Sequence, residues 1–508
     1  MKHPMIRSRR VRYGGMTVYL TVALITALIL LNAIFSALAN YKSWYVDMTA
    51  ERLYSVSDLC YDLLDDAIAD AEKQHGQSVK AEIIFCEDYR NYEKGSVGHY
   101  IYTTAHELEL AYPDNITVSW FDCWIEKSRA VELGVTASTN VVLLMEDGQK
   151  RVFNQKEFFA FETGNTTSPI GYDGERMFAT TLASMIGGER PLAVFTTNHE
   201  ELFYDNGLML SLRDAGYNIR MLDLYYENIP EECELLVCYN PNNDFITSDG
   251  VSETDEIDKL TAYLQDGGDM MVFLSASSPE LPAFERLLAD WGVRIGRTHD
   301  KETGVPYNAM VKDSSVSLTA DGFTIYGEYV TTGNGADITS ILQESSYTPR
   351  VVFSDATVLL PADGYTSQGD ATYQQGNRTR SDVFVGSDRA RAWACGAELE
   401  GYDYLPLMTI TKDSSTDSRV MVCGSIEFAG ESYLKSPVFG NNDVLLSVEK
   451  DMGLDNVLIG LRHKPFATDT ISSITTAQML RWTLGLTLTP AILILAVATF
   501  VLVRRKYS

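Results

Sequence analysis

The sequence predicts an α/β fold in two parts, flanked at both ends by transmembrane helices, and three observations lead to this prediction. Apolar segments without charged residues occupy 16–39 and 482–503, near the two ends of the chain. Between them, short apolar runs alternate with amphipathic stretches, which is typical of strands that alternate with helices. From residue 191 onward the apolar runs have few polar interruptions, which favours a parallel sheet covered by helices on both faces.

Each apolar end segment is long enough for a membrane-spanning helix. At 1.5 Å per residue, the two segments measure about 36 and 33 Å, against a hydrocarbon core of about 30 Å. Basic residues flank both segments, so the positive-inside rule places the tails 1–15 and 504–508 in the cytoplasm. We therefore expect a two-pass cell-membrane protein with both termini cytoplasmic and its main part extracytoplasmic. A cleaved signal peptide is the alternative for the first segment, because Ala37-Leu38-Ala39 resembles a cleavage site.

Composition excludes several classes of partner and site. The chain has 69 acidic and 41 basic residues, a formal net charge of −28. Such a charge repels nucleic acid, so we expect no nucleic-acid partner. The seven cysteines include no CxxC pair and are scattered, which is typical of neither a disulfide framework nor a zinc site. We expect neither a metal nor a cofactor.

The first part of the chain predicts a membrane-proximal helix and a small domain. Residues 40–78 contain an amphipathic helix, with apolar residues at helical spacing between Leu59 and Ile68. Residues 79–188 follow the order strand, helix, strand, helix, hairpin. This order is typical of a thioredoxin-like domain, and because CxxC is absent we expect no redox role for it.

The second part, residues 189–456, consists of repeating strand–helix units. A segment rich in Gly, Ser, Thr and Asp, residues 297–415, predicts a β-rich insertion. A return linker, residues 457–481, then leads to the second apolar segment. Ligands of parallel α/β sheets bind beyond the carboxyl ends of the strands, so we look for a site there.

Four segments, in order, resemble motifs of the GldG-like auxiliary proteins of ABC transporters, a family named for bacterial gliding motility. Residues 47–57 are similar to the family's D-x-T…R-x-Y-S-L-S entry, and residues 190–201 to its strand ending in T-G-H-G-E. Residues 253–274 resemble its E…L-x-x-Y-L-x-x-G-G segment, and residues 420–428 its V-x-x-G-D-S-x-F strand. The resemblance implies a class I glutamine-amidotransferase-like, flavodoxin-like fold for the second part. It also implies work beside an ABC permease and a separate cytoplasmic ATPase.

The candidate site from the resemblance is the turn Asn198, His199, Glu200 and Glu201, which we predict to bind a ligand or partner. Both glycines of the family's G-H-G-E are replaced here, which puts close backbone approach to a ligand in doubt. An imidazole beside a carboxylate could bind a cation or shuttle a proton. The alternative is a polar turn that caps the following helix.

Other candidate residues carry weaker signals. Cys238 ends an apolar strand and Ser425 follows a glycine, but neither has the glycine-flanked elbow of a nucleophile, so a core position is favoured. The loop Asn242–Phe245 could join a binding surface. The acidic run on the first amphipathic helix, Asp62 to Asp70, favours a solvated face over a calcium site.

These observations together predict a non-catalytic accessory subunit of an ABC transport system. The chain lacks a G-x-x-x-x-G-K-[ST] loop, so we expect a separate ATPase to hydrolyse ATP. Its partners would be the permease, the ATPase and the lipid bilayer, and its outer part would bind substrate or partner proteins. The alternative is a membrane-anchored ectoenzyme that acts on cell-envelope polymers.

Overall fold

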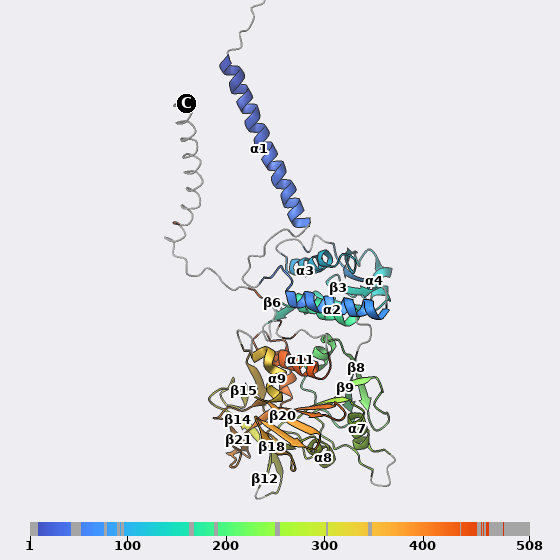
Figure 1. The fold of residues 1–508 in the computed structure, drawn as a ribbon, viewed down its shortest axis with the longest axis vertical. Coiled ribbons are helices and arrows are strands. Elements are labelled where there is room, and N and C mark those ends of the chain that lie inside the picture. Colours follow the sequence, from blue (N-terminus) through green and yellow to red (C-terminus); the bar gives the residue numbers. More distant parts are fainter. Residues whose placement is uncertain are drawn as a thin grey trace, which may run out of the picture. The chain divides into compact units, whose positions relative to one another are not determined.

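A computed structural model of the chain is shown in Figure 1, with its helices and strands labelled. It describes residues 9–41, 52–75, 79–88, 92, 96–161, 167–186, 191–248, 254–300, 303–343, 348–436, 438–454, 459, 461, 464–466 and 481. Residues Met1–Pro465 belong to one compact unit. Within it we call residues 52–186 the first region and residues 191–454 the second region. Both regions are mixed α/β, as the sequence predicts.

Helix α1 (Arg9–Tyr41) contains the first apolar segment, and its side chains are described from residue 19 to residue 35. Across the described residues, no helix combines the length and the apolar character needed to cross a membrane. The predictions of flanking transmembrane helices and of a two-pass cell-membrane location are corrected accordingly. The second predicted segment, 482–503, lies outside the described residues.

The first region is built on a four-stranded sheet with the order β2-β1-β3-β4. Strands β1 and β2 are parallel, whereas β3 runs antiparallel to β1 and forms a hairpin with β4. This is the order of elements that the sequence predicts for residues 79–188. The elements are, in chain order, β1 (Ala81–Phe85), α3 (Gly98–Ala111), β2 (Ile116–Trp120), α4 (Lys127–Leu133), β3 (Asn140–Met145) and β4 (Lys150–Asn154).

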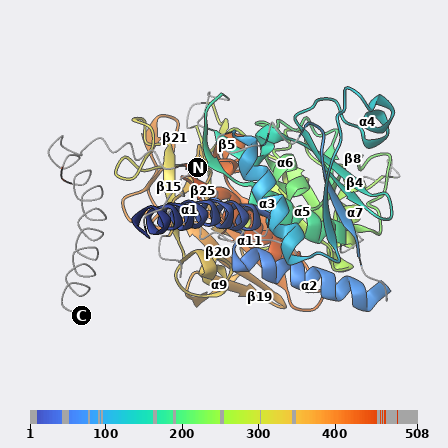
Figure 2. The same cartoon turned by 90° about the horizontal axis from the view of Figure 1, so that it is seen from above.

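Two further helices complete the first region. Helix α2 (Asp58–His75) packs against α5 (Gly174–Ile186), and α5 also contacts α3 (Figure 2). The buried face of α2 includes Cys60, Leu64 and Ala71. The amphipathic helix predicted within residues 40–78 therefore has its apolar face in the core of the first region.

Glu175, in the first turn of α5, links segments that are far apart in the sequence. Its carboxylate accepts a hydrogen bond from the Ser57 N–H at 2.6 Å, just before α2, and forms an ion pair with Lys464. Burial favours the neutral acid, but the charge of Lys464 outweighs burial and lowers the pKa of Glu175. Lys464 lies in a small sheet with the order β25-β6-β5, made of β5 (Phe159–Phe161), β6 (Pro169–Tyr172) and β25 (Lys464–Pro465). The predicted return linker thus contributes a strand to this sheet.

Five parallel strands form the centre of the second region, in the order β8-β7-β9-β10-β24. Numbered along the chain, this order is 2-1-3-4-5, that of flavodoxin-like doubly wound sheets. The strands are β7 (Leu192–Thr197), β8 (Asn218–Asp223), β9 (Cys233–Tyr239), β10 (Asp269–Phe273) and β24 (Arg419–Cys423). Every residue of β10 is buried, because both faces of the sheet are covered.

Helices cover the two faces of this sheet. Phe195, Val237 and Met271 point to the face packed by α6 (Gly207–Asp214) and α11 (Asn441–Asp451). Their strand neighbours point to the other face, packed by α7 (Glu256–Gln265) and α8 (Pro282–Asp290). The remaining helical elements are η2 (Gln155–Phe158), α9 (Asn334–Gln343), η3 (Glu427–Ala429) and α10 (Glu431–Leu434).

The predicted β-rich insertion, residues 297–415, extends this same sheet. Beyond β24, the sheet continues with antiparallel strands in the order β23-β20-β15-β16. These strands are β15 (Thr324–Tyr329), β16 (Val351–Ser354), β20 (Arg378–Val385) and β23 (Pro406–Asp413). Two further strands, β18 (Thr366–Gly369) and β19 (Thr372–Gln375), also belong to this sheet. Shorter strands form small sheets: β11 (Val293–Ile295), β12 (Arg297–His299), β13 (Pro306–Asn308), β14 (Met310–Lys312), β17 (Leu359–Pro361), β21 (Arg391–Ala394) and β22 (Ala397–Glu398).

Glu449 of α11 is a fully buried carboxyl group, and no hydrogen-bond partner for either of its oxygens occurs among the described residues. Burial alone raises the pKa of Glu449 to about 8. The folded protein therefore keeps a proton on Glu449 at pH values where the unfolded chain has released it.

We predict that Glu449→Gln makes the free energy of unfolding decrease less steeply with pH between about pH 4.5 and pH 8. In this window only the unfolded state loses the Glu449 proton, so stability falls by up to about 1.4 kcal/mol per pH unit in the wild type. Urea unfolding at pH 5 and pH 8.5 measures the difference between variant and wild type. Glu132→Gln, at an exposed position of α4, is the control and should leave the pH dependence of the unfolding free energy unchanged. If the unfolding free energies of the wild type and Glu449→Gln depend on pH to the same extent, the prediction is contradicted.

Candidate functional site

The predicted site lies at the topological switch point of the sheet, beyond the carboxyl ends of β7 and β9. In a 2-1-3-4-5 sheet the chain leaves these two strands in opposite directions, which usually opens a crevice for a ligand. The turn Asn198–Glu201 follows β7, and the loop Asn240–Phe245 follows β9. The structure therefore brings the two predicted segments together.

The turn keeps a backbone conformation that favours glycine, although it contains none. Asn198 has φ 80° and Glu200 has φ 53°, at the two positions where the resembled family has glycine. Asparagine tolerates this left-handed conformation, whereas for glutamate it costs about 1–2 kcal/mol. Both side chains are exposed, while His199 and Glu201 point inward.

His199 is held between two buried carboxylates. Its Nδ1 lies 3.1 Å from Oε1 of Glu201, and its Nε2 lies 3.1 Å from Oε2 of Glu256, in the first turn of α7. The imidazole stacks on Phe245 with ring centroids 3.9 Å apart, and Phe245 stacks in turn on Phe284 of α8. The side chain of His199 is only 4 % exposed. These contacts leave neither ring nitrogen open to a ligand.

The two carboxylates fix the charge of the ring. Burial opposes the charged form, but hydrogen bonds and charge from Glu201 and Glu256 outweigh it and raise the pKa of His199 to about 9. Burial likewise favours a neutral Glu256, but the contact with His199 and the Ile246 N–H outweighs burial and lowers the pKa of Glu256. At neutral pH the ring is therefore an imidazolium. An imidazolium already carries the proton that a general base would accept.

Hydrogen bonds close the crevice at the switch point. The His199 carbonyl accepts the N–H groups of Asn242 and Asn243, both at 2.8 Å. The Asn242 side chain donates to the Glu200 carbonyl at 3.1 Å. Asn240, with φ 48°, donates from its side chain to the Leu202 carbonyl at 3.3 Å. The place where such sheets usually bind a ligand is bridged here by the loops themselves.

A second polar group joins the loops after β9 and β10. The side-chain oxygen of Asn240 accepts hydrogen bonds from the hydroxyls of Ser275 and Ser278, at 3.1 and 2.9 Å. Asn308 of β13 donates to the carbonyls of both serines. Sequence reasoning missed these residues, because only the pairing of distant segments brings them together.

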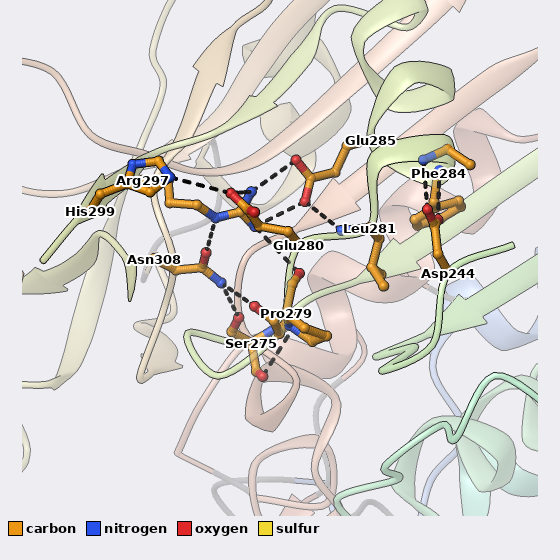
Figure 3. Close-up of polar contacts among 12 residues, drawn as sticks. Asp244, Ser275, Pro279, Glu280, Leu281, Phe284, Glu285, Arg297, His299 and Asn308 are labelled. Atoms are coloured by element: carbon orange, nitrogen blue, oxygen red, sulfur yellow. Dashed lines mark hydrogen bonds and ion pairs between the residues drawn. The ribbon is translucent and has the colours of Figure 1, made fainter. Parts of the chain in front are cut away.

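Arg297 extends this group to the surface (Figure 3). Its guanidinium donates to both carboxylate oxygens of Glu285, at 2.9 and 3.0 Å, and to Asn308 Oδ1 at 2.8 Å. Asp244, in the predicted loop Asn242–Phe245, accepts the N–H groups of Ala283 and Phe284 at the start of α8. The polar side chains at this edge bond to one another and to helix ends.

The two candidate nucleophiles lie in the core. Cys238 is fully buried in β9, and burial raises the pKa of its thiol to about 12. The hydroxyl of Ser425, 1 % exposed, donates to the Ser354 carbonyl at 2.6 Å. Asp62, Asp66 and Asp70 of the acidic run lie on the exposed face of α2. No group of three or more potential metal-ligating side chains occurs in the part of the chain that the structure describes.

A separate candidate site is a cleft of about 800 Å³ between the first and second regions, which we call the interregion cleft. The first region contributes η2, β5 and the start of α5, and the second contributes the ends of α6 and α10 and the start of α11. The lining comprises Lys156, Glu157, Phe159, Ala160, Phe161, Ile170, Asp173, Arg176, Met177, Asp205, Arg213, Asp214, Glu431, Ser432, Leu434, Lys435, Ser436, Val438, Phe439, Asn442, Asp443 and Leu461.

Ion pairs join the two regions beside this cleft. Arg151 of β4 donates to Asp214 Oδ1 and to the Arg213 carbonyl, both at 2.9 Å, at the end of α6. A cation at a helix carboxyl terminus is favourable for the helix dipole. Arg176 of α5 pairs with Asp173. The cleft walls thus come from segments as far apart in the sequence as Lys156 and Asp443.

Comparisons with known proteins show no matching family model and no matching curated protein. Among solved structures, the mmIFT52 N-terminal domain is 15 % identical, with a TM-score of 0.37, covering 53 % of this chain and 100 % of that chain. A cytoplasmic protein from Salmonella typhimurium is 11 % identical, with a TM-score of 0.30, covering 51 % and 98 %. A putative thua-like protein from Bacteroides uniformis is 10 % identical, with a TM-score of 0.29, covering 51 % and 90 %.

We predict that His199→Gln destabilises the fold by about 3 kcal/mol at pH 6, because it leaves two buried carboxylates without a cation. The stability that the wild type gains from the charged His199 is fully present below pH 6.5, the approximate pKa of His199 in the unfolded chain. It is lost as pH rises through the pKa of about 9 that His199 has in the folded protein. Urea unfolding at pH 6 and pH 9.5 measures this. The control is His299→Gln, since His299 is 61 % exposed. An equal loss at both pH values would contradict the role of the charge.

We predict that Glu200→Gly stabilises the fold by about 0.5–1 kcal/mol. The substitution relieves about 1–2 kcal/mol of left-handed strain but adds about 0.4–1 kcal/mol of unfolded-state entropy. Thermal unfolding measures the change. In the control Glu132→Gly, inside α4, the same substitution should destabilise by about 1 kcal/mol. A loss at Glu200 as large as in the control would show that the turn is not strained.

Proposed function

We propose that this chain is a non-catalytic accessory subunit of an ABC transport system, and that it binds substrate or partner proteins in the interregion cleft. The transport context comes from the motif resemblance, and the cleft is the observation that carries the binding role. Binding sites are commonly clefts of about 300–1,000 Å³ at interfaces between domains, with apolar walls and a few polar groups. The interregion cleft, at about 800 Å³, has this size, and its lining combines nine apolar residues with ten charged ones.

The geometry of the carboxyl edge supports binding elsewhere than at the switch point. Both nitrogens of His199 face carboxylates, and the crevice beside it is bridged by loop hydrogen bonds. Asn198 and Glu200 are the members of the turn with exposed side chains. The role of the turn Asn198–Glu201 in binding stays a prediction, in which a ligand would meet these two side chains.

In this proposal, other proteins hydrolyse ATP and translocate the substrate. The sequence has no phosphate-binding loop, so the energy would come from the separate ATPase. Its net charge of −28 gives a long-range attraction for positively charged surfaces of partners. The chain would contribute recognition.

We predict that a permease and an ATPase co-purify with the tagged full-length chain from its source cells. Val438→Lys should reduce their recovery about tenfold, because a long charged side chain replaces apolar contact surface in the cleft. Val438 is 60 % exposed in the cleft lining, so this variant should fold. The matched control is Val131→Lys on α4, where the side chain is 81 % exposed and outside the lining. Mass spectrometry of the eluates measures recovery.

Two results would overturn the proposal. One is the absence of both proteins from wild-type eluates. The other is a hydrolytic activity of the isolated chain that His199→Gln abolishes and His299→Gln retains.

A further inference from the structure

The interregion cleft carries more negative than positive side chains. Its cations are Lys156, Arg176, Arg213 and Lys435, and its anions are Glu157, Asp173, Asp205, Asp214, Glu431 and Asp443. Arg151 pairs with Asp214 from beside the cleft, so five cations face six carboxylates and the walls keep a small excess of negative charge. A positively charged ligand would complement them.

Three of the four cations already have carboxylate partners within the lining. Arg176 pairs with Asp173, and Lys435 with Glu431 at 2.6 Å. Arg213 lies 3.4 Å from Asp214 and 3.9 Å from Glu157. An anionic ligand would have to compete with these pairs for each cation. The walls therefore favour a cation over an anion.

Apolar side chains lie beside these charges. Phe159 and Phe161 of β5 line one wall, and Leu434, Val438 and Phe439 line the other. Val438 is 60 % exposed, so apolar surface is open to a ligand here. An apolar group that enters this space gains about 25 cal/mol for each Å² of apolar surface that it buries.

We infer that the interregion cleft binds a peptide segment that carries both a basic and an apolar side chain. The inference rests on the proposed function and names the ligand class for it. A second copy of this chain is a poorer occupant, because its net charge of −28 would be repelled by the carboxylates of the cleft. A basic, apolar segment of a partner or substrate protein satisfies both walls.

Three capped tetrapeptides test the ligand class with the full-length chain. One alternates lysine with phenylalanine, one glutamate with phenylalanine, and one lysine with serine. Titration calorimetry at low salt should show binding of the lysine–phenylalanine peptide at least tenfold tighter than of either other peptide. Its affinity should fall as salt is raised, because screening weakens the charge term.

Two variants with matched controls locate the binding in the cleft. Val438→Lys should weaken binding of the lysine–phenylalanine peptide at least tenfold, whereas Val131→Lys should not change it. Asp443→Asn should weaken it about threefold to tenfold. Its control is Asp258→Asn, because Asp258 is exposed and is also the third residue of its helix, α7. Both controls make the same substitution outside the cleft lining.

Several outcomes would overturn the inference. Equal binding of the glutamate–phenylalanine peptide would exclude a preference for cations, and unchanged binding by Val438→Lys would place the peptide elsewhere. Sedimentation that shows a dimer lost on Val438→Lys would make a second copy the occupant. If permease and ATPase recovery depends on Val438 but the peptides are not distinguished, only the ligand class fails. If the peptides behave as expected but neither protein is recovered, the ligand class stands and the transport role fails.

Discussion

The buried imidazolium of His199 is the interaction on which the carboxyl edge of the sheet depends. It neutralises Glu201 from its own turn and Glu256 from α7, and it stacks on Phe245 from the loop after β9. Three segments are thus held by one ring. Without the proton, two buried carboxylates would repel each other with no compensating charge. The charge of the ring is therefore a condition for the closed geometry of the switch point.

This closure has a consequence for where a ligand can bind. Parallel sheets usually offer the crevice at the switch point, but here the Asn242 and Asn243 amides bond to the His199 carbonyl. The open space lies instead between the two regions, where Arg151 anchors the end of α6 to β4. The second region thus has a flavodoxin-like strand order, but the cleft lies between the two regions and not at the switch point. Fold-level analogy alone would point to the switch point and not to the interregion cleft.

Local sequence patterns predicted local structure well and long-range pairing poorly. The alternation of strands and helices could be predicted because apolar strands such as β9 and β10 are short and bounded by turn residues. The place of residues 297–415 in the sheet could not be predicted, because β20 pairs with β23 through contacts that no local pattern encodes. The expected transmembrane helices are corrected, since no helix among the described residues is long and apolar enough to cross a membrane.

The candidate site shows the same division. The replaced glycines located the turn, and the positive φ angles of Asn198 and Glu200 explain why glycine suits these positions. The partner Glu256, 57 residues away, gave no signal, because any exposed helix start can carry a glutamate. The charges of the interregion cleft could not be predicted either, since Asp173 and Asp443 come to line the same cleft only after folding. In an acidic chain, the internal pairing of its few cations decides which charge a cleft can still attract.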